Sequence, residues 1–405
     1  MKQLVIQAAA PHTFGSGSGI GALAAAFHTG VLKRLDATLG AHPGAAALWR
    51  ANGTAALPLA ADPGWWQPEV GAVLKHVGQG AMPEAVVQAL LSLHARGTGG
   101  RWTAALAQPE RFSMGGHCFD LDGRVDVEAG PDRVMLARAH LRPLVLVRDA
   151  GAWQLEGGRT ADPGWRHGAP FHLRPGALAG LYLQRWDGAT TDNAGIVIDW
   201  PRRQSSAASD SLYEAAAGFE QAFALLDEAG PCYQAWIKPM LRGICVTPMV
   251  EAGVHNSGSS IYHAGVVSCG FPVDAPLLAE ALVHEVSHQY FHLVHSVMPL
   301  VRKGADEARY YSSLKRAHRP LFLVLLAFHA AANMSLLWDD LLRRSPTPRY
   351  AQELKNTLAH CRSLARHLHA NADLSEFGAI LFETQAGLLS ERGHAICPAP
   401  GQLAG

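Results

Sequence analysis

The sequence places two histidines four residues apart in the segment His284-Glu285-Val286-Ser287-His288, a spacing with the chemistry to bind a divalent metal ion. On a helix, such residues lie one above the other on one face, so both imidazoles can hold the same cation. Glu285 is rotated about 100° from His284, so its carboxylate borders the metal without having to ligate it. Because the chain has 21 histidines, ordinary helix histidines are the alternative. The apolar neighbours favour the metal site, since buried polar groups without partners cost free energy.

The third protein ligand decides which class of metal site this is. One class of zinc peptidase continues the motif with a glycine and a histidine where this chain has Phe291 and Val294, so that class is excluded. Another class takes a glutamate from a following segment, and Glu307 is the nearest. We prefer His329, which lies in the apolar segment 321–332, because a lone imidazole there would otherwise lack a polar partner. An ordinary core histidine is the alternative interpretation.

A helix has to position the metal-binding pair. Asp274 is a typical N-cap residue, and the apolar periodicity that follows predicts a helix from about Ala275 to Val297. His284 and His288 lie in the middle of it. His292 and His295 follow further along the axis, too far for both to reach the same metal, and we expect them to line the cleft.

The remaining chain divides into regions with different predicted secondary structure. Residues 1–110 show helical periodicity, clearest over 20–39 and 84–94. In region 111–205, alternating residues around Asp122-Gly123 predict a hairpin, and 144–147 and 195–199 resemble further strands. Region 206–405 is again helical, apart from strands predicted at 243–247 and 261–267.

These regions define the expected fold class and domain organisation. A chain of 405 residues exceeds the size at which one core usually stops growing, so several modules are expected. We predict an α+β protein that is mainly helical, with a β-rich middle section. The expected domains are an N-terminal helical region (1–110), a β-rich region (111–205) and a helical metal-site domain (206–405).

Composition excludes several kinds of partner. Basic and acidic residues balance at 34 each, so neither nucleic acid nor an anionic membrane is an expected partner. The longest apolar stretch, 321–332, is shorter than the roughly 20 residues that span a bilayer. The six cysteines form no Cys-x-x-Cys pair, which indicates isolated thiols of a reducing compartment. We therefore expect a cytoplasmic protein.

Several motifs together carry a resemblance to a known family. The segment 278–285 with His288 is followed by Tyr310-Tyr311-Ser312-Ser313 and by Arg319-Pro320-Leu321. This part of the chain, about 257–335, resembles the HExxH-type peptide β-hydroxylases of ribosomal natural-product gene clusters, which depend on iron and 2-oxoglutarate. Fainter similarity appears at Pro68-Glu69-Val70-Gly71 and at 374–378.

The resemblance implies an iron(II)- and 2-oxoglutarate-dependent dioxygenase that hydroxylates the β-carbon of a residue in a ribosomally made precursor peptide. It implies that His284, His288 and His329 hold Fe(II). Such an enzyme also needs a cation for the distal carboxylate of 2-oxoglutarate, which arginine binds well. Arg319, with Tyr311, is expected in that role, and Arg302 and Arg316 are alternatives. Glu285 would orient ligands or substrate.

Two other functions remain open from the residues alone. In a zinc peptidase, the metal would polarise a peptide carbonyl and Glu285 would be the general base that activates the bound water. In a non-catalytic peptide-binding module, the metal site would be vestigial. Metal identity and the reaction product distinguish the three.

Overall fold

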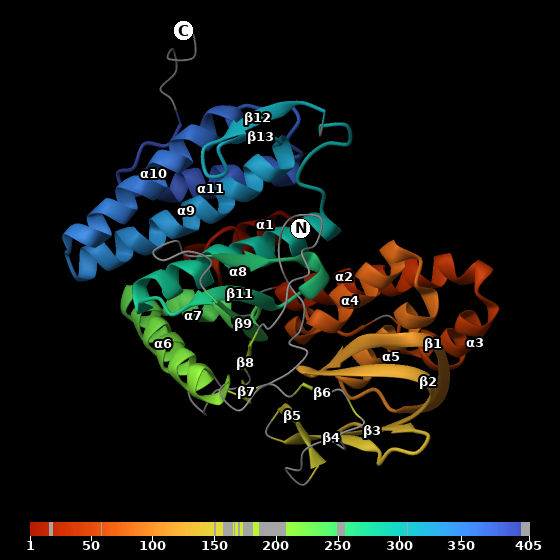
Figure 1. The fold of residues 1–405 in the computed structure, drawn as a ribbon. Coiled ribbons are helices and arrows are strands. Elements are labelled where there is room, and N and C mark those ends of the chain that lie inside the picture. Colours follow the sequence, from red (N-terminus) through yellow and green to blue (C-terminus); the bar gives the residue numbers. More distant parts are fainter. Residues whose placement is uncertain are drawn as a thin grey trace. The chain divides into compact units, whose positions relative to one another are not determined.

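The computed structural model describes residues 1–15, 19–57, 59–149, 151–156, 165, 167–168, 171–172, 181–185, 208–248, 256–305 and 307–397 (Figure 1). The fold is α+β and mainly helical, with the strands concentrated in the middle of the chain, as the sequence predicts. The chain forms two compact units, each built from separate stretches of sequence. The first unit comprises Met1–Leu23, Gly218–Met240 and Val273–Gly405, and the second comprises Ala24–Ala217 and Leu241–Pro272.

These two units cut across the three consecutive regions expected from the sequence. Helix α1 (Lys2–Ala9) packs against α8 (Ala275–Val297) and α11 (Glu376–Glu391), so the start of the chain shares a core with its end. Changes in composition along a chain indicate which elements form, but not which distant elements share a core.

The first unit is a helical bundle with one small hairpin. Long helices from the C-terminal part of the chain form most of it, and short N-terminal segments pack against them. Its other elements are η1 (Pro11–Thr13), the end of α6 (Ala208–Ala229), α7 (Pro231–Ile237), β12 (Arg309–Ser312), β13 (Ala317–Pro320), α9 (Leu321–Arg344) and α10 (Pro348–Leu368).

Helices α8 and α9 pack against each other in antiparallel directions. Their contacts lie three or four residues apart on α8, which is the spacing of one helix face, and run backwards along α9. Polar contacts near the start of α8 give way to aromatic packing near its end. The contacts are Glu280 with Trp338 (3.3 Å), His284 with Met334 (3.3 Å), Ser287 with Asn333 (3.0 Å) and Phe291 with Phe322 (ring centroids 5.1 Å).

The predicted metal-site helix is confirmed in both position and capping. It spans Ala275–Val297, and the Asp274 carboxylate accepts a hydrogen bond from the Leu277 N–H at 3.3 Å. Such a cap satisfies one of the N–H groups that a helix leaves unpaired at its start. Arg349 of α10 donates hydrogen bonds to both carboxylate oxygens of Asp274, which connects the cap of α8 to α10.

Helix α9 is long and apolar enough to cross a membrane by length and composition. However, 83% of its most apolar 18-residue window is buried inside the structure. That burial is typical of the core helix of a soluble protein.

A polar network closes the far end of α9. Asp340 accepts hydrogen bonds from the Tyr233 hydroxyl (2.8 Å) and Arg392 (2.5 Å), and contacts His12 at 2.8 Å. Its neighbour Asp339 pairs with Arg392 at 2.9 Å. Both carboxylates therefore have cationic or hydroxyl partners, as partly buried charges require.

The second unit combines helices with two sheets. Helices α3, α4 and α5 pack against strand β1, and this helical side of the unit is visible in Figure 1. The first sheet has the order β1-β2-β3-β4-β5, with β6 paired to β2. The elements are α2 (Ile20–Thr38), α3 (Pro43–Asn52), η4 (Pro63–Trp65), α4 (Pro68–Gln79), α5 (Met82–His94), β1 (Gly100–Met114), β2 (His117–Ala129), β3 (Arg133–Arg138), β4 (Leu144–Asp149), β5 (Ala152–Leu155) and β6 (His167–Gly168).

The hairpin predicted at Asp122-Gly123 is wrong. Strand β2 runs through both residues, and Gly123 is paired with Leu106 of β1. The turn lies instead at Gly115-Gly116, between Met114 and its partner His117. Both turn glycines have positive φ (58° and 86°), which is what a two-residue hairpin loop requires. Gly123 also has a positive φ, but there it accompanies an irregularity in the register and does not reverse the chain.

The second sheet has the order β10-β11-β9-β8-β7 and a parallel centre. Strand β9 (Gly243–Pro248), predicted from the sequence, pairs in parallel with β8 (Tyr182–Arg185) and β11 (Val266–Phe271). The strand expected at 261–267 is only partly confirmed, because its first residues form the short helix η6 (Ile261–His263). The edge strands are β7 (Phe171–His172) and β10 (Ser257–Ser259). The strand predicted at 195–199 lies outside the described residues.

Candidate metal centre

Helix α8 brings three ligand-type side chains of the first unit into one group. One ligand atom from each of His284, Glu285 and His288 lies within 4.8 Å of the other two. The two imidazole centroids are 4.6 Å apart and their planes are nearly perpendicular, at 88°. The His284 Nε2 and Glu285 Oε1 atoms are 3.8 Å apart. These distances allow one small cation to contact all three side chains.

The two helices orient His284 through a sulfur atom. The His284 Nδ1 lies 3.3 Å from the Met334 sulfur of α9. A thioether sulfur has no proton to donate and accepts weakly, so the Nδ1–H is the donor in this contact. In this tautomer the Nε2 of His284, which lies 3.8 Å from Glu285 Oε1, keeps its lone pair for a metal.

His288 offers a buried nitrogen that the protein itself does not satisfy. Its Nδ1 is buried and makes no hydrogen bond to any residue that the structure describes. An unsatisfied buried polar atom is costly and calls for a ligand, water or ion. The imidazoles of His284 and His288, together with the adjacent Glu285 carboxylate, form a donor set that fits a divalent metal.

Burial keeps both imidazoles in the form that binds metals. It lowers the pKa of His284, and the Glu285 carboxylate opposes part of this effect. It also lowers the pKa of His288, further than that of His284, and the neighbouring His284 and His292 add to the effect. Both rings are therefore neutral at neutral pH, and a neutral imidazole is the metal ligand.

The structure does not bring His329 into the group of His284, Glu285 and His288. The ring is fully buried, and its Nε2–H donates to the Ala9 carbonyl of α1 at 3.0 Å. The same carbonyl accepts from Asn333 at 3.1 Å. The sequence argument assumed that this buried imidazole would lack a partner, but a backbone carbonyl from the distant N-terminus supplies one.

The second ring nitrogen of His329 is the atom that a metal could use. The Nδ1 of His329 is buried without a hydrogen-bond partner in the described part of the chain. Metal-binding histidines commonly donate their other N–H to a backbone carbonyl, as His329 does to Ala9. A ligand role for His329 stays a prediction. Glu307, the alternative, is exposed and is not part of the group.

The predicted cofactor residues Tyr311 and Arg319 both lie on the β12–β13 hairpin, but not on one face. Arg319 is paired with Tyr310, whereas Tyr311 is paired with His318. Adjacent residues of a strand point to opposite faces, so Arg319 shares a face with Tyr310 and not with Tyr311. The Tyr310 ring contacts His367 of α10 (centroids 5.6 Å), while Tyr311 is 42% exposed. Arg302 and Arg316 are exposed.

Sequence reasoning missed two side chains near the metal group. Lys315 lies in the turn of the hairpin, and its charge adds to the lowering of the pKa of both His284 and His288. Glu280 lies one helical turn before His284, and burial raises the pKa of its carboxyl to about 7. The four-residue spacing between Glu280 and His284 could have predicted that Glu280 lies on the same helix face. Nothing in the sequence indicated Lys315, because only the tertiary fold determines which distant charges act on α8.

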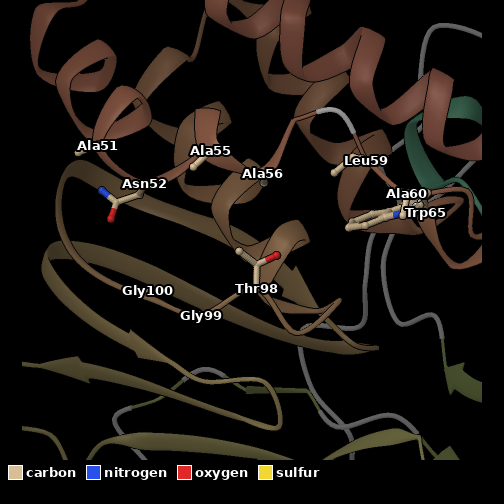
Figure 2. A pocket seen from close by; sticks show the side chains of 10 residues that line it. All are labelled: Ala51, Asn52, Ala55, Ala56, Leu59, Ala60, Trp65, Thr98, Gly99 and Gly100. Atoms are coloured by element: carbon tan, nitrogen blue, oxygen red, sulfur yellow. Dashed lines mark hydrogen bonds between the residues drawn. The ribbon is translucent and has the colours of Figure 1, made fainter.

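A cavity of the second unit, away from α8, is lined by no acidic or basic side chain. It has a volume of about 410 Å³ and lies in the second unit, lined mainly by alanines and glycines with Asn52, Thr98 and Trp65 (Figure 2). None of its lining residues is an acid, a base or a nucleophile of lowered pKa.

No family model matches this chain, and no curated protein matches it significantly. The resemblance to the peptide β-hydroxylases thus depends on the motifs quoted from the sequence.

Proposed function

We propose that this protein is an iron(II)- and 2-oxoglutarate-dependent hydroxylase of the cytoplasm that acts on the β-carbon of a residue in a ribosomally made precursor peptide. The observation that carries the proposal is the compact group of His284, Glu285 and His288. The two histidines can serve as two of the three protein ligands of a non-haem Fe(II) oxygenase, with His329 as the proposed third, and such a site keeps coordination positions for a keto acid and oxygen. The choice of 2-oxoglutarate and of a peptide comes from the family resemblance.

The surroundings of the group favour iron over the zinc peptidase alternative. Peptidases of the two-histidine type complete their zinc site with a glutamate from a following segment. Helix α9, which packs on α8, contains no glutamate. Its two acidic residues, Asp339 and Asp340, are bound to arginine, histidine and tyrosine at the far end. Glu307 is exposed. Among the described residues, the third zinc ligand of that class has no candidate near the pair.

Each residue then has a defined task. His284 and His288 hold the metal. Glu285 holds the His284 ring in position, and its carboxylate lies beside both imidazoles. We propose Arg319 for the distal carboxylate of 2-oxoglutarate, because a guanidinium binds a carboxylate through two parallel hydrogen bonds. Tyr311 stays a proposed contact, but its opposite face on the hairpin separates its task from that of Arg319. Fe(II) with 2-oxoglutarate supplies oxidation of a C–H bond by dioxygen, with release of succinate and carbon dioxide.

The test uses the full chain loaded anaerobically with Fe(II) and then exposed to oxygen and 2-oxoglutarate. Decarboxylation of 2-oxoglutarate by the iron-loaded protein would release succinate, which is measured with and without iron and with and without oxygen. Succinate that depends on both iron and oxygen supports the proposal. Absence of succinate, together with cleavage of a fluorogenic peptide by the zinc-loaded protein, would establish the peptidase instead.

The variant Glu285→Gln separates the two chemistries further. In a peptidase this carboxylate takes a proton from metal-bound water, and general-base catalysis contributes about 10²–10⁴-fold. The variant should then keep its metal and lose cleavage. In the hydroxylase no protein base is required, so succinate formation should fall only in part, through misplacement of His284.

A further inference from the structure

The short N-terminal helix α1 ends against helix α9 in the first unit. Its last carbonyl, that of Ala9, accepts hydrogen bonds from the His329 Nε2–H at 3.0 Å and from the Asn333 side-chain amide at 3.1 Å. The last carbonyls of a helix have no partner within that helix. Here α9 supplies two partners, from residues four apart on one helix face. These two bonds hold the end of α1 on α9.

Asn333 also contacts the helix that carries the candidate metal ligands. Its amide donates to the Ser287 hydroxyl at 3.0 Å, and Ser287 directly precedes His288 on α8. The Ser287 hydroxyl donates in turn to the Val283 carbonyl at 2.7 Å. Both N–H donors of one side-chain amide are therefore used. Through them Asn333 connects three helices, α1, α8 and α9.

The stability of the fold alone gives little reason for an asparagine at this position. The side chain is fully buried, and its Oδ1 atom has no hydrogen-bond partner in the described part of the chain. The cost of such an unsatisfied atom is comparable to the net gain from the two bonds that the amide donates. We therefore look for a role of these two bonds beyond stabilising the fold.

Helix α1 depends on its contacts with the rest of the first unit. It has only eight residues and no side-chain cap at its start, and isolated helices of this length are not stable in water. Val5, Ala8 and Ala9 bury their side chains, and the helix packs against α8 and α11. Exchange of its backbone amides therefore reports how firmly α1 is bound to the unit.

We propose that Asn333 is a positioning residue that couples the binding of α1 to metal binding on α8. The Ala9 carbonyl holds the His329 ring by Nε2, which leaves Nδ1 for a metal. Asn333 holds this same carbonyl and links it to Ser287, beside the ligand His288. Coupling of this kind is reciprocal, so α1 and the metal strengthen each other's binding by the same factor. The inference rests on the proposed function, because it takes His329 as the third metal ligand.

The first measurement is the metal affinity of the full chain by chelator competition, with Fe(II) under anaerobic conditions and with Zn(II) in parallel. Asn333→Ala should weaken binding of both metals at least tenfold, within the range typical for loss of a residue that supports a metal ligand. A merely structural role would lower the urea midpoint and leave the metal affinity of the folded protein unchanged. Ser335→Ala is the matched control, because Ser335 is also buried on α9 but donates to the Ala331 carbonyl of its own helix.

The second measurement is hydrogen exchange of the wild-type protein, which decides the question even if Asn333→Ala does not fold. Saturating metal should slow the exchange of α1 amides about tenfold more than that of α10 amides, because the coupling factor acts equally in both directions. Helix α10 has no part in the hydrogen bonds to Ala9 and Ser287, so it reports the general stabilisation by the metal. In Asn333→Ala the difference between the two helices should become smaller.

The outcomes separate this inference from the proposed function. The coupling is overturned if Asn333→Ala binds metal like Ser335→Ala, or if the metal slows exchange equally in α1 and α10. The proposed function would still stand in either case. Coupled metal binding without formation of succinate would support the coupling and overturn the hydroxylase. If the wild-type protein binds neither metal, both proposals are overturned.

Discussion

The metal group of the first unit differs in construction from the cavity of the second unit that is lined by Arg96, Arg148 and Arg242. The metal group lies on one helix, and burial removes the charge of its imidazoles so that they accept a cation. The arginine-lined cavity gathers residues from turns and strand ends that are far apart in the sequence, and Arg96 in it forms an ion pair with Asp62. Helical spacing fixes the first site locally, whereas only the tertiary fold creates the second. Local sites of this kind can be found from a sequence, and non-local ones cannot.

The largest effect is expected from the metal ligands. His284→Ala or His288→Ala should abolish stable iron binding, because each change removes a direct metal bond from a group with few donors. We expect the far-UV circular dichroism to stay unchanged, since both rings are partly exposed. Iron per chain after anaerobic loading and desalting is the measurement. His369→Ala, at an exposed histidine of the same unit, is the matched control. Wild-type iron content in either ligand variant would contradict the site.

A pH dependence of stability should arise beside the metal group. Burial raises the pKa of Glu280 from 4.5 to about 7, so the folded state holds its proton more tightly than the unfolded state does. The stability from this group is complete below about pH 4.5 and is lost as pH rises through about 7. The loss corresponds to roughly 3 kcal/mol.

Urea unfolding between pH 5 and 8 measures this dependence, with Glu280→Gln as the comparison. The glutamine keeps an acceptor for the Trp338 indole N–H, which lies 3.3 Å from the carboxylate. The variant should lose most of the slope over this range. An equal slope in wild type and variant would assign the dependence to other groups.

A smaller effect is expected from the residue that orients His284. Met334→Leu keeps an apolar side chain of similar volume, so stability should change by less than about 1.5 kcal/mol. It removes the acceptor for the His284 Nδ1–H, which lies 3.3 Å from the sulfur. Loss of such a supporting contact typically weakens metal binding by about 10–100-fold, and we expect the lower end for a weak acceptor. Competition with a chelator for Fe(II) gives the affinity, and an unchanged value would show that packing alone orients the ring.

The same contrast between local and distant information separates the successful predictions from the unsuccessful ones. The helix Ala275–Val297 and its Asp274 cap followed from local periodicity and capping chemistry, and both are confirmed. The turn at Asp122-Gly123 is wrong because two glycines, Gly115 and Gly116, supply a better one a few residues earlier.

Distant partners account for the rest. The partner of His329 is a carbonyl 320 residues away, which no local pattern reveals. The cavity of the second unit brings together Arg96, Arg148 and Arg242, and none of the three belongs to a motif. The opposite faces of Tyr311 and Arg319 follow from the register of a hairpin that the sequence did not predict.

The central claim is that one iron ion is bound by His284 and His288 beside Glu285. A crystal structure of the full chain loaded anaerobically with Fe(II), with data collected at the iron absorption edge, tests it most directly. The account predicts one anomalous peak about 2.0–2.3 Å from a ring nitrogen of each histidine, within the range of metal–imidazole bonds. The same map would show whether His329 Nδ1 completes the site. An iron peak away from α8, or no peak in protein that binds iron stoichiometrically in solution, would contradict the account.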